Sequence, residues 1–238
     1  MVHGEGVGRP TPDEIVVSVL LPTRQRVTLM RESVASLLAT ATAPASVEVL
    51  LAVDRDDAET LAALPTLPVA VRSIVVPRFG FPQLHEYFNL QARIARGRWL
   101  LIWNDDKIME SAGWDQVLAE TPPCVGWLAS NQRWNTSPAV PRAWTELVGH
   151  VALQLHVDSW WNHVGRFSGY RRQLPITFTH HRFDLTQENN DPGFRSRAYD
   201  RVTFDSPEVQ ALVRHDAAQI KQAMQAQGIV APPWTEPA

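Results

Sequence analysis

Residues 99–106 of this chain read Trp-Leu-Leu-Ile-Trp-Asn-Asp-Asp, an apolar run that stops at two adjacent carboxylates. A short run of bulky apolar side chains predicts a strand that is buried on both faces of a sheet. Asp105 and Asp106 then fall at its carboxyl end, the edge at which open α/β sheets bind their ligands. Adjacent acids repel each other unless a positive charge lies between them. A divalent cation that holds a phosphate-bearing substrate meets that requirement.

The chain before this strand alternates between strand-like and helix-like windows. Apolar runs predict strands at residues 15–21, 47–53, 71–76 and 99–103, and the windows between them predict helices at 30–41, 57–64 and 83–95. This alternation predicts a mainly parallel sheet with helices on both faces. Right-handed crossovers bring the strand ends at Pro22, Asp54, Pro77 and Asn104 to one edge.

The second half of the chain is less regular. Its windows predict a helix at 113–120, a strand at 125–129, a loop at 131–141, partly helical segments at 146–155 and 158–164, a strand at 176–179, a loop at 187–194 and a helix at 207–227. All nine tryptophans lie from Trp99 onward, which indicates either core packing in this half or flat rings for a sugar or a base.

Composition limits the class of protein. The 238 residues fit one large domain, and the net charge of −3 gives no general attraction to nucleic acid or to an anionic membrane. Cys124 is the single cysteine, so no internal disulfide can form, and a cytoplasmic location is expected. No stretch has the roughly 18 apolar residues of a membrane span, and the amino-terminal segment has no apolar signal region.

Four segments resemble, in order, the inverting family 2 glycosyltransferases, which have the GT-A fold. They are residues 19–26, residues 49–54, Asn89 with residues 95–102, and residues 104–106 in the place of the family's Asp-X-Asp motif. The resemblance covers about the first half of the chain. It implies a GT-A-type, Rossmann-like sheet in one domain, with a nucleotide-sugar-binding half at 14–110, an acceptor-binding half at 111–230, and flexible ends at 1–13 and 231–238.

The resemblance also implies an activity, the metal-dependent transfer of a sugar from a UDP- or GDP-sugar to an acceptor hydroxyl with inversion. Such transfer needs neutralisation of the leaving diphosphate, a base for the acceptor hydroxyl and a fixed nucleotide. By the resemblance, Asp106 is the ligand of Mn²⁺ or Mg²⁺ and Asp105 contacts the ribose or a metal-bound water. Asn104 replaces the first acid of the motif. The alternative is that Asp105 and Asp106 cap the next helix.

Other residues are expected at the nucleotide. Asp54 matches the family position that accepts a hydrogen bond from the base, and its alternative is a turn acid. Thr23 and Arg26, which follow Pro22, are expected to meet the nucleotide or its phosphates, because an arginine fork binds two phosphate oxygens. Arg78 is a further candidate of the same kind, and a solvated surface charge is the alternative for these arginines.

A late histidine completes the metal site of some GT-A enzymes, and His180 and His181 resemble that placement. Adjacent residues on a strand point to opposite sides, so only one of the two is expected to face the metal.

Asp158 is the candidate base, with Glu146 and Asp191 as competitors and a helix cap as its alternative role. Trp160, Trp161 and Arg171 are expected at the acceptor.

Two rival functions stay open. A nucleotidyltransferase shares a related sheet and metal, but residues 22–26 lack the glycine-rich loop with which those enzymes open. A non-catalytic carbohydrate-binding protein is compatible with Asn104 in the motif. The acceptor could be a glycan, a protein, a metabolite or a hydroxylated DNA base, and the net charge gives the last no support.

Overall fold

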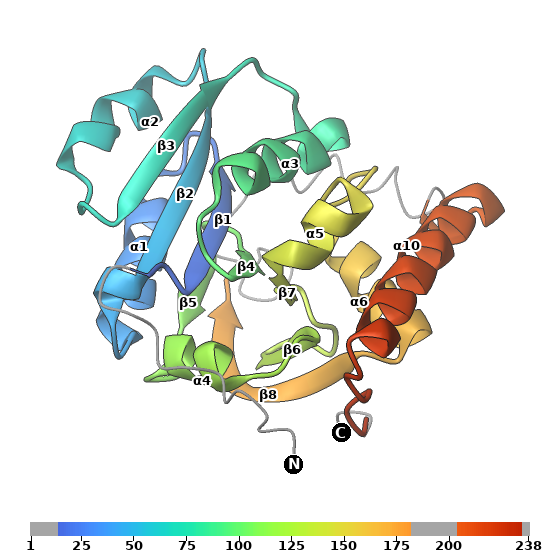
Figure 1. Ribbon diagram of the computed structural model, residues 1–238. Helices are drawn as coiled ribbons and strands as arrows, with labels where there is room; N and C mark the ends of the chain where they lie inside the picture. Colours follow the sequence, from blue (N-terminus) through green and yellow to red (C-terminus); the bar gives the residue numbers. More distant parts are fainter. Residues whose placement is uncertain (1–13, 182–203, 235–238) are drawn as a thin grey trace.

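An eight-stranded mixed sheet runs through the computed structural model, which describes residues 14–181 and 204–234 (Figure 1). The strand order across the described sheet is β3-β2-β1-β4-β7-β6-β8-β5. The strands are β1 Val17–Thr23, β2 Val47–Asp54, β3 Val71–Val76, β4 Trp99–Ile102, β5 Lys107–Met109, β6 Val125–Ser130, β7 Ala139–Pro141 and β8 Arg171–His180.

The first four strands are parallel to one another, and β6 is parallel to β8. The pairs β4–β7, β6–β7 and β5–β8 are antiparallel. Because β1 to β4 share one direction, their carboxyl ends meet at a single edge, as the sequence predicts. The predicted α/β class with a mostly parallel sheet is therefore confirmed.

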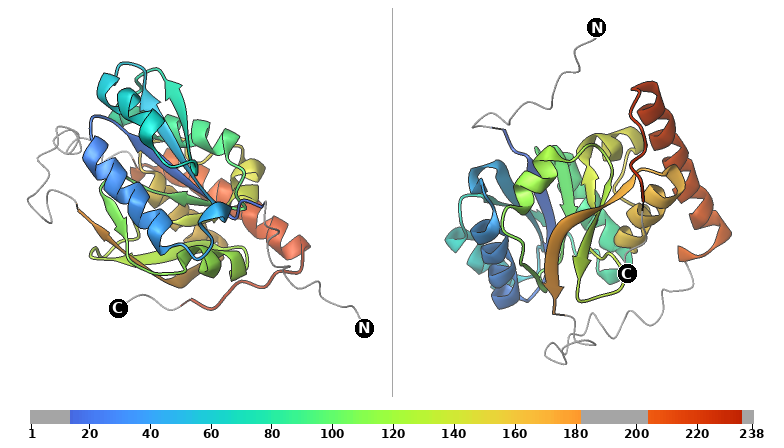
Figure 2. Two further views of the ribbon diagram at one scale, coloured as in Figure 1. Left: turned by 90° about the vertical axis from the view of Figure 1, so that its left-hand side faces the viewer. Right: turned by 90° about the horizontal axis from the view of Figure 1, so that it is seen from below.

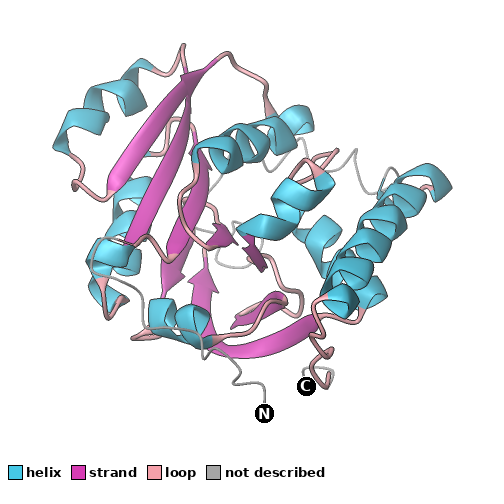
Figure 3. Ribbon diagram, in the orientation of Figure 1, coloured by secondary structure: helices cyan, strands magenta, loops and turns pink. Residues whose placement is uncertain are grey.

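Helices cover both faces of the sheet (Figures 2 and 3). One apolar core joins the sheet to α1, α2 and α4, and a second joins its other face to α3, α5, α6 and α10. The helices are α1 Val27–Thr40, α2 Ala58–Ala63, α3 Leu84–Ile94, α4 Trp114–Glu120, α5 Arg142–Val148, α6 Val157–Ser168 and α10 Pro207–Ala226. No helix in residues 14–181 or 204–234 has the length and apolarity that crossing a membrane requires.

Successive side chains of the central strands point to opposite faces of the sheet and so belong alternately to the two cores. Val19 and Leu21 of β1 belong to the core under α1, and Leu20 between them belongs to the core under α3. All three side chains are fully buried. Burial of each contributes about 1.5–3 kcal/mol to folding, which explains why this short apolar run fixes the middle of the sheet.

At the amino edge of the sheet, the side chain of Glu48 links several elements by hydrogen bonds, and this residue is 1% exposed. Its carboxylate accepts hydrogen bonds from Ser18 Oγ at 2.6 Å, Arg72 Nη1 at 2.8 Å and Arg96 Nε at 2.9 Å. Burial alone would raise the pKa of Glu48, but the donors outweigh it and lower the pKa. A Cβ on Gly97 would lie 2.4 Å from Ser18 N, so only glycine allows this close approach.

The second half departs from the predictions in several places. The end of the predicted loop 131–141 forms β7, β8 is much longer than the predicted 176–179, and the predicted helix at 146–155 is instead α5 at Arg142–Val148. Trp234, in the predicted flexible end, packs on Trp127 with ring centroids 5.7 Å apart. The predicted loop at 187–194 and the amino-terminal 1–13 lie outside the described residues.

Candidate active site at the carboxyl edge of the sheet

Asp105 joins the end of β4 to the loop between β1 and α1. Its carboxylate accepts a hydrogen bond from Thr23 Oγ1 at 2.7 Å and one from Arg26 Nη1 at 2.6 Å. Arg26 Nη2 also lies 3.7 Å from Asp106 Oδ2. Both acids are 4% exposed. The structure thus brings Thr23, Arg26, Asp105 and Asp106 together, and Pro22 lies beside them in β1.

The two acids differ in their electrostatics. Burial raises the pKa of Asp105, Arg26 opposes that rise, and the neighbouring Asp106 adds to it. Burial would also raise the pKa of Asp106, but His180, Arg26 and Lys107 outweigh it and hold the pKa below its usual value. Asp106 is therefore the acid that these cationic and imidazole groups keep ionised.

His180 is the histidine that faces Asp106. Its Nε2 lies 3.0 Å from Asp106 Oδ1, because β8 pairs antiparallel with β5 and sets His180 opposite Lys107. The Asn131 side chain accepts from the His180 backbone N–H at 3.0 Å and donates to the His180 carbonyl oxygen at 3.2 Å. The backbone N–H of His181 donates to the Asp106 carbonyl oxygen at 2.7 Å.

Asp106 and His180 fit a divalent cation. Two ligand atoms on neighbouring corners of an octahedron with bonds of about 2.1 Å lie about 3.0 Å apart, which matches the Oδ1–Nε2 separation. Gln132 Nε2 lies 2.5 Å from His180 Nδ1. An amide nitrogen only donates, so this contact puts the proton of a neutral His180 on Nε2. A cation at Nε2 would need the Gln132 amide turned, with its Oε1 accepting from Nδ1–H. No group of three or more acidic, histidine or cysteine side chains is arranged for a metal within the described ranges. Substrate oxygens and water would have to complete the coordination.

Lys107 is a buried residue that the sequence reasoning missed, although it follows the acid pair directly. Its side chain is fully buried, and its ammonium donates to Asn104 Oδ1 at 2.6 Å, the Thr136 carbonyl at 2.7 Å and Ser137 Oγ at 2.7 Å. Asn104 is therefore held by Lys107. This contact ties the acidic loop to residues 136–137, which precede β7.

Asp54 ends β2 at the same edge and is 2% exposed. Tyr87 Oη, a second group that the sequence reasoning missed, donates to its Oδ1 at 2.5 Å, and Arg24 Nη1 donates to its Oδ2 at 2.9 Å. Burial raises the pKa of Tyr87, and the hydrogen bond to Asp54 adds to the rise. Arg78, by contrast, is 59% exposed and faces Asp56 at 3.9 Å.

The loop that presents Thr23 and Arg26 carries one unusual backbone conformation. Gln25 has φ 54°, which is uncommon for a residue with a Cβ. Its N–H donates to Asp57 Oδ2 at 2.7 Å, and the Asp57 side chain also caps α2 through Thr60. Strain held by such a contact fixes the direction in which the loop points.

Asp158 lies in the first turn of α6, and its Oδ1 accepts from Ser159 N at 2.7 Å. Four residues on, and so on the same helix face, Asn162 exchanges hydrogen bonds with Asn135 at 2.6 and 3.1 Å. Asn135 adjoins the residues that hold Lys107. The competitor Glu146 pairs with Arg142, whose Nε donates to Gly97 O at the opposite edge of the sheet, so Glu146 is not near the acid pair. Asp191 lies outside the described residues.

The residues predicted at the acceptor need correction. Trp160 and Trp161 are fully buried in the core under α6, so they offer no surface to a substrate. Trp160 Nε1 donates to Asp216 Oδ2 at 2.9 Å. Arg171 begins β8, nine residues or about 30 Å from His180, and its guanidinium lies 3.8 Å from the Trp234 ring centroid.

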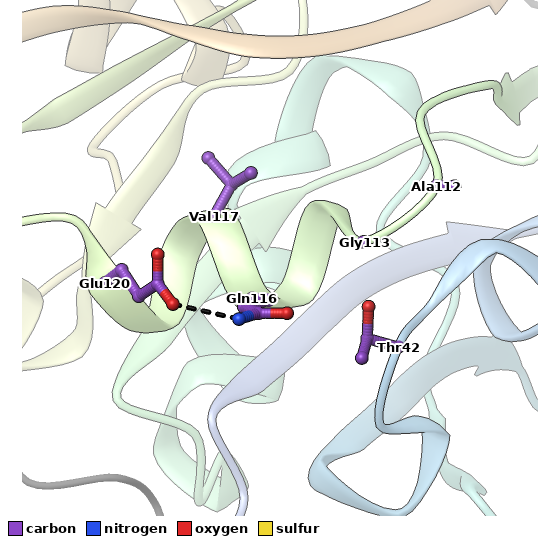
Figure 4. A pocket seen from close by; sticks show the side chains of 6 residues that line it. All are labelled: Thr42, Ala112, Gly113, Gln116, Val117 and Glu120. Atoms are coloured by element: carbon purple, nitrogen blue, oxygen red, sulfur yellow. Dashed lines mark hydrogen bonds between the residues drawn. The ribbon is translucent and has the colours of Figure 1, made fainter.

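A shallow pocket lies away from these residues, beside α4 and the end of α1 (Figure 4). Its only carboxylate, Glu120, accepts from Gln116 Nε2 at 2.9 Å. The 14 residues of α1 separate Arg26 from the pocket residue Thr42, a length of about 21 Å. This pocket is therefore not part of the acid site.

Comparison with known proteins identifies the fold. No protein-family model matches the sequence, and no curated protein matches it. Among solved structures, the mannosyltransferase PcManGT from Pyrobaculum calidifontis, in complex with GDP-Man and Mn²⁺, superposes with a TM-score of 0.56 at 15% identity, over 93% of this chain and 79% of that protein. S. aureus TarS superposes with a TM-score of 0.53 at 11% identity, over 69% of this chain. Its fragment 1–349 in complex with UDP gives 0.52 at 13% identity, over 70% of this chain.

This chain spans only 35% of the length of TarS and 58% of its 1–349 fragment. At these identities the likeness establishes a GT-A-like α/β fold.

Proposed function

We propose that this chain is a metal-dependent glycosyltransferase that moves a sugar from a UDP- or GDP-sugar to an acceptor hydroxyl with inversion. The proposal rests on the 3.0 Å distance between Asp106 Oδ1 and His180 Nε2. A carboxylate and an imidazole, both ligands that Mn²⁺ accepts, thus lie side by side at the ligand-binding edge of the sheet. The mannosyltransferase of similar fold binds GDP-Man and Mn²⁺, and TarS binds UDP, which supports this donor class.

We assign the cation to Asp106 and His180, with Mn²⁺ as the ion better suited to a mixed oxygen and nitrogen site. When bound, the cation stabilises the negative charge that develops on the departing diphosphate. Arg26 and Thr23 hold Asp105 beside it, toward the ribose or a metal-bound water. Asp54, with Tyr87 and Arg24 on its oxygens, is assigned to the nucleotide base.

Asp158 is assigned as the general base. The acceptor hydroxyl oxygen attacks the anomeric carbon while its proton passes to the Asp158 carboxylate. The bond between that carbon and the diphosphate oxygen breaks, and the nucleoside diphosphate leaves with the bonding electrons. Attack from the face opposite the leaving group inverts the anomeric carbon. Support for Asp158 comes from its helix face, which it shares with Asn162 and the Asn135 contact.

The test is release of UDP or GDP from a panel of UDP- and GDP-sugars with MnCl₂, with water or an added sugar as the acceptor. The wild type should release nucleotide from at least one donor, and Asp106→Asn and Asp158→Asn should each lower the rate at least a hundredfold. Glu120→Gln, in the pocket of Figure 4, is the matched control and should keep the wild-type rate. Nucleotide binding without any release would favour the non-catalytic alternative, and an Asp106→Asn variant of full activity contradicts the proposed metal site.

A further inference from the structure

Residues 131–137, between β6 and β7, form a loop that is tied to the site on both sides. Asn131 and Gln132 contact His180, and Lys107 holds the carbonyl of Thr136. Further along the same loop, Asn135 Nδ2 donates to the Gly126 carbonyl at 3.2 Å. The middle of the loop is therefore fixed in place relative to Asp106 and His180.

Trp134, in the middle of this loop, is 68% exposed. All nine tryptophans lie in the described ranges, and it is the only one of them whose surface is mostly in solvent. Its Cα is two residues from Gln132 and from Thr136, so it lies within about 7 Å of each. The Arg133 guanidinium stands 5.5 Å from the ring centroid and pairs a cation with the indole. An exposed indole on an anchored loop is a preformed binding face, because little of its freedom remains to be lost on binding.

Nearby charge argues against a polyanionic partner for this face. Arg24 is engaged by Asp54 and Asp56, Arg26 by Asp105, and Lys107 is fully buried. Arg133 is one exposed cation beside Trp134, and the described part of the site offers no run of uncompensated cations, which binding to a phosphate backbone requires. A ring with an apolar C–H face and hydroxyl edges needs only a flat aromatic surface and one or two polar donors.

We propose that Trp134 and Arg133 form the acceptor subsite, and that the acceptor is a carbohydrate whose sugar ring stacks on the Trp134 indole while Arg133 contacts its hydroxyl or acidic groups. This proposal rests on the proposed function, and it takes over the acceptor role that the buried Trp160 and Trp161 cannot fill. It selects a glycan from the four acceptor classes that the sequence leaves open.

The experiment uses saturation-transfer NMR on the full chain with GDP or UDP and MgCl₂. The probes are the methyl pyranosides of glucose, mannose, galactose and N-acetylglucosamine, and oligothymidine as a stacking competitor. At least one pyranoside should give saturation of its ring C–H protons, and Trp134→Ala should weaken its binding about tenfold or more, the effect expected from removing one stacked ring. Val230→Ala, which removes an 86% exposed apolar side chain elsewhere, is the control and should change nothing.

Other results overturn the proposal. Saturation that is the same in Trp134→Ala, or absent for every pyranoside, removes Trp134 from the acceptor subsite. Binding of oligothymidine that disappears in Trp134→Ala makes the stacking partner a base instead of a sugar. Nucleotide affinity is measured in the same samples by calorimetry. If GDP and UDP both fail to bind, the proposed function itself is wrong, whereas nucleotide binding without Trp134-dependent sugar binding rejects only the subsite.

Discussion

Replacing Asp216 with asparagine should stabilise the protein above pH 6 and leave it unchanged near pH 4. Asp216 on α10 is 4% exposed, accepts from Trp160 Nε1 at 2.9 Å and lies 3.5 Å from His150 Nε2. Burial raises its pKa to about 6, although the Trp160 hydrogen bond opposes the rise. Burial lowers the pKa of His150, so His150 supplies no charge to balance the carboxylate at neutral pH.

The magnitude follows from the two pKa values of Asp216. A carboxyl with a pKa of 3.8 in the unfolded chain and about 6 in the folded chain binds more protons when folded between these values. Its contribution to stability is therefore present below about pH 4 and is lost as the pH rises through 6, a change of about 3 kcal/mol. Asparagine removes the charge and keeps an oxygen for Trp160. The variant should therefore match the wild type at low pH and exceed it by up to about 3 kcal/mol at pH 7.5.

Urea unfolding followed by circular dichroism at a series of pH values measures this difference. Trp160→Phe is a companion variant that removes the donor that lowers the Asp216 pKa. The pH at which the chain loses stability through Asp216 should therefore be higher in this variant than in the wild type. A stability difference between Asp216→Asn and the wild type that does not vary from pH 4 to pH 7.5 refutes the reasoning.

Three further predictions concern polar side chains that hydrogen-bond to buried groups. Glu48→Gln should lower the free energy of unfolding by about 1.5–3 kcal/mol, because a buried acceptor loses the charge that strengthens its hydrogen bonds to Ser18, Arg72 and Arg96, and a loss under about 1 kcal/mol in urea unfolding argues against this. Lys107→Met should lower the free energy of unfolding by about 3–5 kcal/mol, since three acceptors lose their donor, and unchanged stability shows that these three hydrogen bonds are dispensable. Gln132→Leu should weaken Mn²⁺ binding about 10- to 100-fold by releasing the ring of His180, as measured by calorimetry, and an unaltered affinity removes Gln132 from the support of the metal site.

The first half of the fold was predictable because local and tertiary signals agree there. The β-branched runs that form β2 and β3 are buried or paired along their whole length, and the structure starts both at the predicted residues. Asp57 was predicted within a short helix and serves as the N-cap of α2. The 20-residue helix α10 begins at the predicted Pro207 because Ser206 caps it and its apolar stripe is regular.

The second half was predicted less well because its strands are short and pair at long range. β5 and β7 have three residues each, too few to show a period, and they pair with β8 and β4 across 73 and 42 residues of sequence at their outermost pairs. Trp160 and Trp161 show the same limit, because the sequence does not tell an aromatic side chain that packs in the core from one that faces a ligand.

The site was predictable where it depends on strand ends. Asp105 and Asp106 lie together with Thr23 and Arg26 because parallel strands end at one edge. Their roles toward donor and metal stay predictions. The buried Lys107 could not be anticipated, since its three acceptors include a backbone carbonyl and a hydroxyl from a loop about 30 residues away.

The most direct measurement of the central claim is a titration of Mn²⁺ followed by electron paramagnetic resonance, in the presence of GDP or UDP, on the wild type, Asp106→Asn and His180→Gln. The account predicts one bound Mn²⁺ per wild-type chain and affinity at least tenfold weaker in both variants, because Asp106→Asn removes the negative charge of one ligand and His180→Gln removes the imidazole of the other, whose atoms lie 3.0 Å apart. Equal Mn²⁺ affinity in all three proteins, or no bound ion in the wild type with either nucleotide, contradicts it.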